Sequence, residues 1–490
     1  MPSPEDIIIQ ERKEKLLNWI KLKGNPYFQS FSPDIKVEGI REKFSYLEKG
    51  EKSGIVVSLA GRVIAQRVHG KAAFMDLRDG TGKIQLYGRL NSLGDKYQLF
   101  SRVDVGDIIG VRGEVFKTHT GELTVEVEDF TLLAKSLRPL PEKWHGLQDV
   151  ELRYRKRWLD LIVNPKTREI LLTRDRVVKT IRDFLDKKGF VEVETPIMQP
   201  VPGGATARPF STYHNALGRN FYLRIAPELY LKKLVVGGVE KVYELSRNFR
   251  NEGIDRFHNP EFTMLEVYQA YANYIDVMQF TEEILQKVTE AVKGNLKITY
   301  NGKEINLSPP WKKITFKDAL REIGEIEVNW EDENELRKIA GKYGINAEEL
   351  TKPQILEHLL DKRVVPHLIQ PTVVYDYPYE TAPLAKRKKE DPSLVERFEL
   401  FVGGWELANA YSELNDPLEQ KERFKEFAEE KFIDWDFLES LEYGMPPTGG
   451  LGIGIDRLIM LLTDSSSIRE VILFPQLKPR NQVHNNQEEW

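Results

Sequence analysis

The segment FRNEGIDRFHNPEFTML, residues 249–265, concentrates side chains that could bind a nucleotide. Guanidinium groups bind phosphate or carboxylate oxygens through paired hydrogen bonds, and aromatic rings stack on bases. Arg250 could therefore hold a phosphate, His258 could reach the distal phosphates, and Phe262 could stack on a purine. A surface hairpin held by ion pairs uses the same residue types and contributes little stability. The segment therefore favours a nucleoside triphosphate site only if other segments complete it.

The same segment predicts a hairpin. Arg250 and Glu252 are two residues apart, so they would share one face of a strand. Gly253 would begin a turn, and residues 258–262 would return on a second strand.

A glycine-rich segment, GLGIGIDRLIM at residues 450–460, precedes an apolar helical pattern. Backbone N–H groups in such a turn, together with the N-terminus of the helix, favour anions. Arg457 would lie just inside the helix and could reach the same nucleotide. The segment lacks the Gly-Lys-Ser/Thr sequence of a P-loop. The glycines could equally serve close packing of a strand against a helix.

The segment GGWELANAYSELND, residues 403–416, predicts a strand with polar groups on one face. Asn409, Tyr411 and Glu413 alternate, whereas Glu406 is out of phase with them. If all four serve one site, the strand must carry a bulge between Glu406 and Asn409. Two carboxylates beside a triphosphate suit Mg²⁺. A half-exposed strand with solvated acids is the alternative, which the flanking apolar residues disfavour.

Bulk composition restricts the class of protein. The 490 residues predict more than one domain, and the absence of cysteine excludes disulfides and thiolate metal sites. The sequence shows no signal-peptide core and no apolar run long enough to cross a membrane, so we expect a cytoplasmic protein. A net charge of −5 gives no global sign of nucleic-acid binding, although local patches could still bind it.

Residues 53–137 contain short β-rich runs separated by Gly-containing turns, which is typical of a small closed barrel such as the OB-fold. On such a barrel, Phe74 could stack on a single-stranded base, with Arg67, Arg78 and Gln85 beside it. Phe74 could equally belong to the core of the barrel.

The remaining segments predict an α+β protein. Residues 1–52 form a helical lead, 138–165 a Pro-rich linker, and 166–490 a catalytic domain with a charged helical insertion at about 311–363. The apolar strand at 190–195 ends at Pro196, as an edge strand would. A partner subunit is one way to cover such an edge.

These motifs, together with GFVEVETPIM, PGGATARPF and YLRIAPELYLK, resemble the class II lysyl-tRNA synthetases from about Asn18 to Pro479. The resemblance implies an N-terminal OB-fold β-barrel that binds the anticodon and an antiparallel-sheet catalytic domain with a helical insertion. It implies a homodimer that uses KGFVEVETP as its interface motif. It also implies a Mg²⁺-dependent ligase that converts L-lysine and ATP to lysyl-adenylate and pyrophosphate, then transfers lysine to the 3′ end of tRNA(Lys).

The resemblance also implies residue roles. Arg250 and Arg457 are the expected catalytic residues, and the expected ATP contacts are Arg250, Glu252, His258, Asn259, Phe262 and Arg457. The expected lysine contacts are Gly204, Glu228, Glu266, Tyr268, Asn409 and Glu413. Glu406 and Glu413 are the expected Mg²⁺ ligands, which gives Glu413 two roles that the sequence does not rank. The expected anticodon contacts are Arg67, Phe74, Gln85 and Glu122.

Related functions remain as alternatives. Aspartyl- and asparaginyl-tRNA synthetases share this architecture, but an aspartate side chain would be repelled by the acids expected in this pocket, whereas an ammonium pairs with them. A nucleic-acid-binding protein with a retired catalytic domain is disfavoured by the intact charged set. A relative that lysylates a protein instead of tRNA would typically lack residues 53–137.

Overall fold

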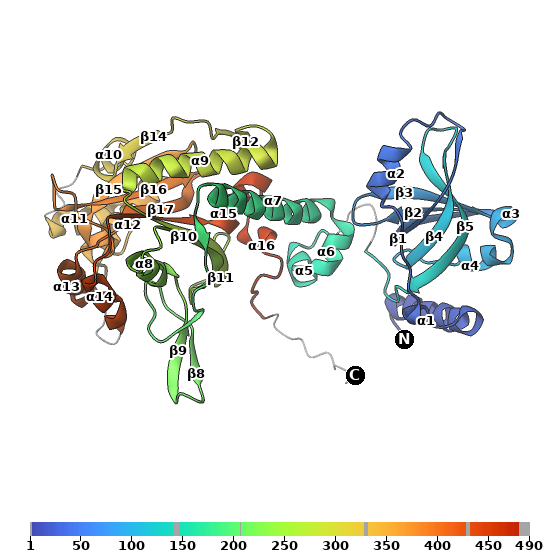
Figure 1. Cartoon of the computed structure of the whole chain (residues 1–490), viewed down its shortest axis with the longest axis horizontal. Helices are drawn as coiled ribbons and strands as arrows, with labels where there is room; N and C mark the ends of the chain where they lie inside the picture. The colour runs from blue at the N-terminus through green and yellow to red at the C-terminus, as the bar shows by residue number, and fades with distance from the viewer. Residues whose placement is uncertain (1, 142–146, 206, 328–331, 428–431, 480–490) are drawn as a thin grey trace. The chain divides into compact units, whose positions relative to one another are not determined.

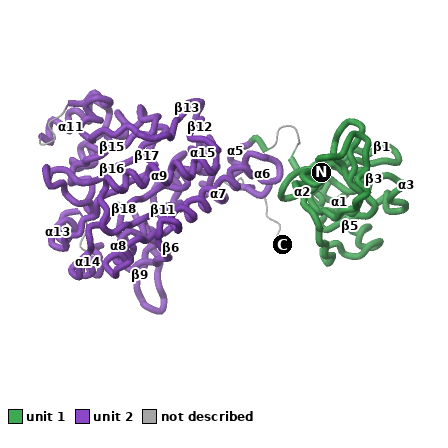
Figure 2. The backbone as a smooth tube through the Cα atoms, turned by 45° about the horizontal axis from the view of Figure 1, so that its top comes forward, with its two compact units in different colours: residues 1–148 green, residues 149–490 purple. Residues whose placement is uncertain are grey.

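The computed structural model separates the chain into two units, residues 1–148 and 149–490 (Figure 2). It describes residues 2–141, 147–205, 207–327, 332–427 and 432–479. Part of the expected linker, residues 142–146, lies outside the described residues. Residues 149–163, also expected within that linker, form two helices of the second unit instead.

The first unit is a closed barrel with strand order β1-β2-β3-β5-β4 and short flanking helices (Figure 1). Its elements are α1 (Pro4–Lys23), η1 (Pro26–Phe28), α2 (Val37–Lys43), β1 (Lys52–His69), β2 (Ala72–Arg78), β3 (Lys83–Arg89), α3 (Leu90–Leu93), η2 (Gly94–Lys96), α4 (Tyr97–Phe100), β4 (Ile108–Lys117) and β5 (Leu123–Ala134). Burial alternates along β2: Ala73, Met75 and Leu77 face the core, so Phe74 and Asp76 face outward. The predicted barrel is confirmed.

The second unit is built on one mainly antiparallel sheet with strand order β14-β15-β16-β17-β18-β11-β10-β6. Only its two edge pairings, β14–β15 and β6–β10, are parallel. The sheet strands are β6 (Val191–Glu192), β10 (Lys241–Phe249), β11 (Glu261–Ala270), β14 (Lys312–Thr315), β15 (Thr372–Pro378), β16 (Leu394–Val402), β17 (Trp405–Ser412) and β18 (Thr448–Gly454). The α+β class is therefore confirmed.

Helices cover both faces of this sheet. The long helices α7 (Pro165–Lys187) and α9 (Tyr274–Lys293) run along one face (Figure 1), where α15 (Ile455–Thr463) completes an apolar core. Helix α8 (Glu228–Val236) packs on the opposite face, where Leu231 and Val235 meet Val242 and Tyr268. The polar side chains of the strands lie on the same face as α8, because the other face is occupied by the apolar core.

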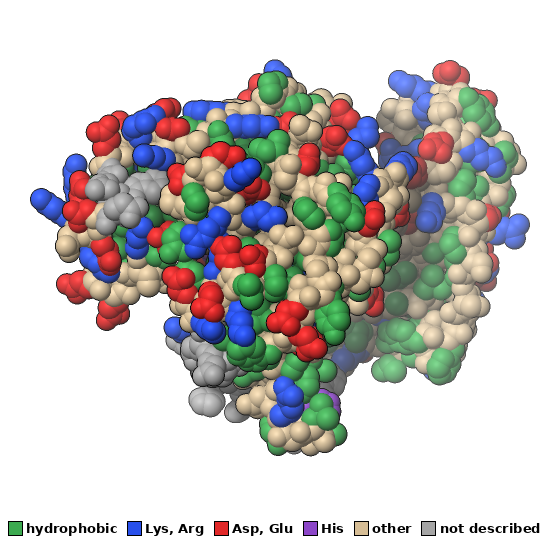
Figure 3. Space-filling model, turned by 60° about the vertical axis from the view of Figure 1, so that its left-hand side comes forward, with side chains coloured by type: hydrophobic (Ala, Val, Ile, Leu, Met, Phe, Trp, Pro, Cys, Tyr) green, Lys and Arg blue, Asp and Glu red, His purple; other side chains and the backbone are tan. Residues whose placement is uncertain are grey.

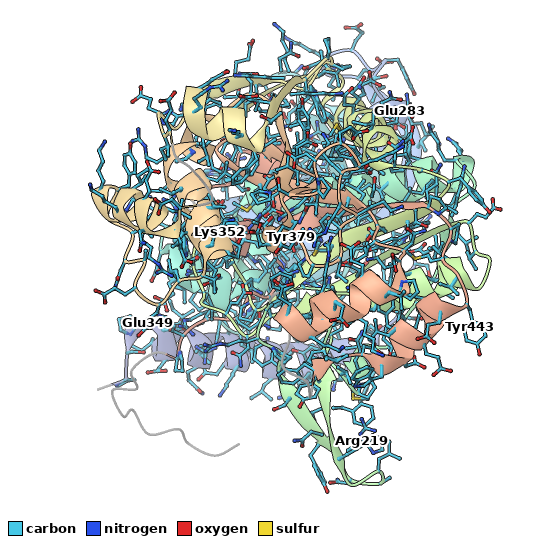
Figure 4. All side chains as sticks on the ribbon, turned by 90° about the vertical axis from the view of Figure 1, so that its left-hand side faces the viewer. Arg219, Glu283, Glu349, Lys352, Tyr379 and Tyr443 are labelled. Atoms are coloured by element: carbon cyan, nitrogen blue, oxygen red, sulfur yellow. The ribbon has the colours of Figure 1, made fainter. Side chains whose placement is uncertain are left out.

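The smaller elements surround this framework. They are α5 (Val150–Arg155), α6 (Arg157–Val163), β7 (Met198–Gln199), β8 (Ser211–His214), β9 (Arg219–Leu223), β12 (Lys297–Tyr300), β13 (Lys303–Asn306), α10 (Phe316–Glu322), α11 (Glu333–Lys342), α12 (Lys352–Arg363), η3 (Val365–His367), η4 (Tyr379–Thr381), α13 (Pro417–Phe427), α14 (Trp435–Glu442) and α16 (Ile468–Val471). The β8–β9 hairpin, which carries Arg219, projects from the body of the unit (Figures 1 and 4).

Three local expectations differ from the structure. Strand β10 ends at Phe249, so Arg250 and Glu252 lie in a loop and not in a strand. The expected insertion includes β14, which is an edge strand of the main sheet. The glycine-rich segment at 450–460 is not a turn: residues 448–454 form β18, which lies between β17 and β11.

The surface and the helices agree with the composition. Lys and Arg side chains intermix with Asp and Glu on the face of the molecule in Figure 3. Within the described part of the chain, every helix is too short or too polar to cross a membrane.

Candidate active site

Strand register places the predicted residues of β11 and β17, two glycines of β18 and two charged residues of β16 in two rows on the face that α8 covers. Each residue in a row is paired with the next on the neighbouring strand. The first row is Glu266, Gly452, Asn409 and Glu399, and the second is Tyr268, Gly450, Tyr411 and Arg397. Segments far apart in the sequence therefore meet on one surface.

Strand β17 contains the bulge that its sequence predicts. Leu400 pairs with Ala408, but the next residue, Phe401, pairs with Glu406. Leu407 is the extra residue, and it is buried beside Ala408. The bulge moves Glu406 onto the face that carries Asn409.

The glycines of β18 make room for this surface. A Cβ added to Gly450 would lie 1.9 Å from Oε1 of Glu413 and 2.7 Å from Cε1 of Tyr268. Gly452 is less crowded: its added Cβ would lie 3.1 Å from the flexible end of Met264 and 3.8 Å from the backbone oxygen of Asn409, which is an ordinary contact. Gly450 is therefore required because Glu413 and Tyr268 occupy the position that a side chain would take, and not for a phosphate-binding turn.

Three buried carboxylates lie close enough to interact, because the charge of Glu228 acts on both Glu266 and Glu413. Glu228 and Glu266 are each 4% exposed, and Glu413 is 0% exposed. The Tyr268 hydroxyl donates a hydrogen bond of 3.2 Å to Oε2 of Glu266. Gly204 lies beside Glu228, since its added Cβ would be 2.9 Å from the Glu228 Cβ. The structure thus brings together the residues expected to bind the amino acid.

Burial perturbs these acids. It raises the pKa of Glu266 to about 8, and the negative charge of Glu228 adds to the rise. Burial also raises the pKa of Glu413, although the ammonium of Lys232 opposes that rise. Lys232, which the sequence analysis did not single out, lies between Glu228 and Glu413.

A cationic patch adjoins the acids. The guanidinium carbon of Arg250 lies 5.1 Å from the centre of the Phe262 ring. Its positive charge also lowers the pKa of Glu266, against the larger effect of burial. Arg250 therefore lies between an aromatic surface and the acidic pocket.

Arg457 contacts one residue expected to bind metal, Glu406, and one expected to bind ATP, His258. Its Nη1 donates to the backbone oxygen of Glu406 at 2.7 Å and to Oε2 of Glu406 at 3.2 Å. Its Nη2 lies 3.5 Å from Nε2 of His258, whose Nδ1 is 2.8 Å from Oδ2 of Asp255. Arg457, Glu406 and His258 thus form one cluster.

The barrel carries a separate aromatic surface. Phe74 faces outward and stacks on Tyr87 at a centroid distance of 4.8 Å, and Tyr87 lies 6.2 Å from Phe116. Arg67 is the cross-strand neighbour of Phe74. Phe74 therefore does not belong to the core of the barrel, which was the alternative that the sequence left open. Sequence reasoning missed Tyr87 and Phe116, although Tyr87 follows Gln85 at the spacing of one strand face.

The other two expected anticodon residues lie near the same barrel strands. Oε1 of Gln85 accepts a hydrogen bond of 3.1 Å from the hydroxyl of Thr124, and Glu122 is exposed just before β5. Gln85 pairs with Thr124 across β3 and β5, and Glu122 lies two residues before Thr124.

Comparison with known proteins identifies this architecture. Residues 149–478 match the family "tRNA synthetases class II (D, K and N)", and residues 57–133 match "OB-fold nucleic acid binding domain". The chain belongs to the class II tRNA synthetases.

Three similar curated proteins match this chain over nearly its entire length. The lysine–tRNA ligase of Carboxydothermus hydrogenoformans is 55% identical over 485 residues, which is 97% of this chain and 98% of that protein. The lysine–tRNA ligase of Moorella thermoacetica is 51% identical over 489 residues, or 98% and 99% of the two chains. That of Clostridium tetani is 49% identical over 494 residues, or 98% and 97%.

Two expected ATP ligands of the synthetase have surroundings other than Arg457. Glu252 is exposed in the loop after β10. Asn259 is buried, and its amide donates to the carbonyl of Glu261 at 2.5 Å and to Oε1 of Gln476 at 2.7 Å. Asn259 thus ties the loop to the C-terminal segment.

The two carboxylates expected to bind metal have different surroundings. Glu406 lies against Arg457, whereas Glu413 lies against Lys232. Glu399 is one acid that interacts with Glu406: burial raises the Glu399 pKa to about 7 against the Arg397 guanidinium, and the charge of Glu406 adds to the rise. The charge of Glu406 also adds to the rise that burial causes in the pKa of Asp361. Sequence reasoning missed Glu399, which cross-strand pairing places opposite Asn409.

Proposed function

We propose that this class II synthetase is a lysine–tRNA ligase. It activates L-lysine with ATP to lysyl-adenylate and pyrophosphate, and then transfers lysine to the 3′ end of tRNA(Lys). The observation that carries the proposal is the group of three interacting buried carboxylates, Glu228, Glu266 and Glu413, next to Arg250. The similar curated proteins are named lysine–tRNA ligases, and the similarity covers nearly the entire length of both chains.

The acids favour lysine over aspartate and asparagine. The α-ammonium is bound by Glu228 and the Gly204 backbone, with Glu266 behind them. The side-chain ammonium meets Glu413 and the hydroxyl of Tyr268. An aspartate carboxylate at that position would face like charge in a buried site, which is strongly unfavourable. Asn409 lies near the carboxylate of the substrate.

Activation requires positioning and charge stabilisation, and no protein nucleophile. The lysine carboxylate attacks the α-phosphate in line, and pyrophosphate leaves. Arg250 holds the α-phosphate and the substrate carboxylate, where charge develops, while Phe262 and Arg457 enclose the adenine. His258 and Glu252 contact the phosphates and adenosine, and Asn259 supports their loop. The terminal hydroxyl of the tRNA then attacks the carbonyl of the adenylate, AMP leaves, and the hydroxyl proton passes to a phosphate oxygen of the AMP.

The Mg²⁺ that we propose for this reaction fits a pair of carboxylates. Glu399 and Glu406 would hold it, because their mutual repulsion is relieved by a hard dication with oxygen ligands. When bound, the ion neutralises charge on the phosphates. Glu413 is then left to the amino acid, since Lys232 already compensates its charge.

Lysine affinity should increase with pH. Glu266, with a pKa of about 8, must lose its proton before it attracts an ammonium. Lysine binding below this pKa therefore expels a proton, so we expect the KM for lysine to fall by up to about tenfold per pH unit between about pH 6.5 and 8. Steady-state pyrophosphate exchange at each pH measures this. The KM for ATP is the internal control, and Glu266→Gln should flatten the profile. A flat wild-type profile would contradict the assignment.

The aromatic surface of the barrel is proposed to bind anticodon bases. Phe74→Ala removes one stacking ring, so tRNA binding should weaken by about 1–3 kcal/mol while adenylate formation is unchanged. Filter binding of tRNA(Lys) together with pyrophosphate exchange separates the two effects. Equal loss of both activities would mean that Phe74 only supports the fold. Arg67, Gln85 and Glu122 would supply polar contacts beside it.

A homodimer is proposed to cover the edge of the sheet. Strand β6 is the outermost strand beyond β10, and Val191, Ile197 and Met198 are 46–53% exposed near it. A second copy that packs on this edge would bury them.

Because ATP and tRNA are the proposed substrates, we expect the enzyme to work in the cytoplasm.

Transfer of labelled lysine to tRNA tests the proposal. With ATP and a tRNA(Lys) transcript, acid-stable lysine should appear on the RNA and be released by mild base. Lysine that becomes attached to protein instead would indicate a protein-lysylating relative. Absence of any lysyl transfer by folded protein would overturn the proposal.

A further inference from the structure

Lys232 places an ammonium group inside the pocket. It lies one helical turn after Glu228 in α8, and its side chain is 0% exposed. Its Nζ is 2.7 Å from Oε1 of Glu228 and 2.5 Å from Oε2 of Glu413. Burial opposes the charge on Lys232, but the two carboxylates outweigh that effect and raise its pKa. Lys232 is therefore a fixed cation between two acids.

This cation changes the charge that a substrate meets. Glu228, Glu266 and Glu413 contribute three negative charges when ionised, and Lys232 contributes one positive charge, which leaves two negative charges. Lysine brings two ammonium groups, and its carboxylate faces Arg250. The two negative charges that remain in the pocket therefore balance the two positive charges of the ammonium groups.

We propose that Lys232 is a built-in counter-ion that sets the charge of the pocket and so selects an amino acid with two ammonium groups. The inference rests on the proposed function, because it assumes that lysine occupies this pocket. Lys232 touches no reacting atom, so it is a positioning residue.

The oxygens of the two acids are divided between Lys232 and the space for the substrate. Lys232 takes Oε1 of Glu228 and Oε2 of Glu413. Neither oxygen of Glu413 has a hydrogen-bond partner among the described residues, so the contact of Oε2 with Lys232 is an ion pair, and Oε1 lies against Gly450. Oε2 of Glu228 faces Gly204, whose added Cβ would lie 3.7 Å away. One oxygen of each acid thus lies outside the ion pairs with Lys232, and this is the oxygen that an ammonium of the substrate would approach.

Removal of the counter-ion should change lysine recognition specifically. Glu228 and Glu413 would then repel each other, and one of them would take up a proton. Lysine would have to displace that proton, and a neutral side chain would no longer be excluded as strongly. The nucleotide site, which is built on Arg457 and Phe262, would be unaffected.

The test is Lys232→Met, assayed by pyrophosphate exchange with lysine and with L-norleucine, which keeps the carbon chain of lysine and lacks its side-chain ammonium. We expect the KM for lysine to rise by about 10-fold to 100-fold with kcat and the KM for ATP within about threefold of wild type. The preference for lysine over norleucine should fall by about the same factor as the KM rises. Lys233→Met is the matched control, because Lys233 bonds to Asp436 outside the pocket.

A second variant covers the case in which the Met variant does not fold. Lys232→Gln keeps hydrogen-bond donors between the two acids but carries no charge, and the same rise in KM is expected from it. Wild-type KM and preference in either folded variant would overturn the inference, as would equal rises in the KM values for lysine and ATP. Failure of the proposed function is distinguishable, because the wild-type protein would then show no lysine-dependent exchange.

Discussion

Arg250→Ala should reduce lysine-dependent exchange of pyrophosphate into ATP by about 100-fold to 1000-fold. Arg250 adjoins both Phe262 and the acidic pocket, so it can hold the α-phosphate and the attacking carboxylate together. Charge develops on these groups in the transition state, and loss of one fixed donor there costs about this much. The loss should therefore appear in kcat/KM and largely in kcat.

Arg321→Ala is the control for this variant, because Arg321 forms only surface ion pairs with Asp318 and Glu322. It should exchange pyrophosphate at the wild-type rate. If folded Arg250→Ala protein also retained nearly normal exchange, Arg250 would not hold the reacting groups.

Gly450→Ala should abolish most lysine activation without a change of charge. The added methyl would lie 1.9 Å from Oε1 of Glu413 and 2.7 Å from the Tyr268 ring, so both groups must move from the position for the side-chain ammonium. Overpacking at a buried site costs about 1–3 kcal/mol or more, and we expect kcat/KM for lysine to fall by about 100-fold. The KM for ATP should change little.

Gly452→Ala provides the comparison within the same strand and face. Its methyl would meet the flexible end of Met264 at 3.1 Å, which can shift at small cost. We expect a much smaller loss than at Gly450. Equal effects at both positions would mean that β18 tolerates no side chain at all, and that Gly450 has no specific relation to Glu413.

The sequence predicted features that depend on local spacing. The phase of Glu406 against Asn409 required a bulge, and the structure has one at Leu407. The residues YNGKE at 300–304 are typical of a hairpin turn, and β12 and β13 form this hairpin around Asn301 and Gly302. The outward position of Phe74 remained undecided, because the two faces of a barrel strand alternate and only the closed barrel defines its inside.

Features that depend on pairing between distant strands could not be predicted in this way. The glycines at 449–454 give a local signal for a turn, yet β18 is a strand because β11 and β17 pair with it on both sides. Glu399 became a candidate ligand only when the register placed it opposite Asn409. Lys232 was missed as well, although it is four residues from Glu228, which is the spacing of an ion pair on a helix.

Pyrophosphate exchange with each of the twenty amino acids in turn tests the central claim most directly. The buried acids predict that lysine supports exchange and that aspartate and asparagine do not. Exchange that depends on aspartate or asparagine, or no exchange with any amino acid, would contradict the account.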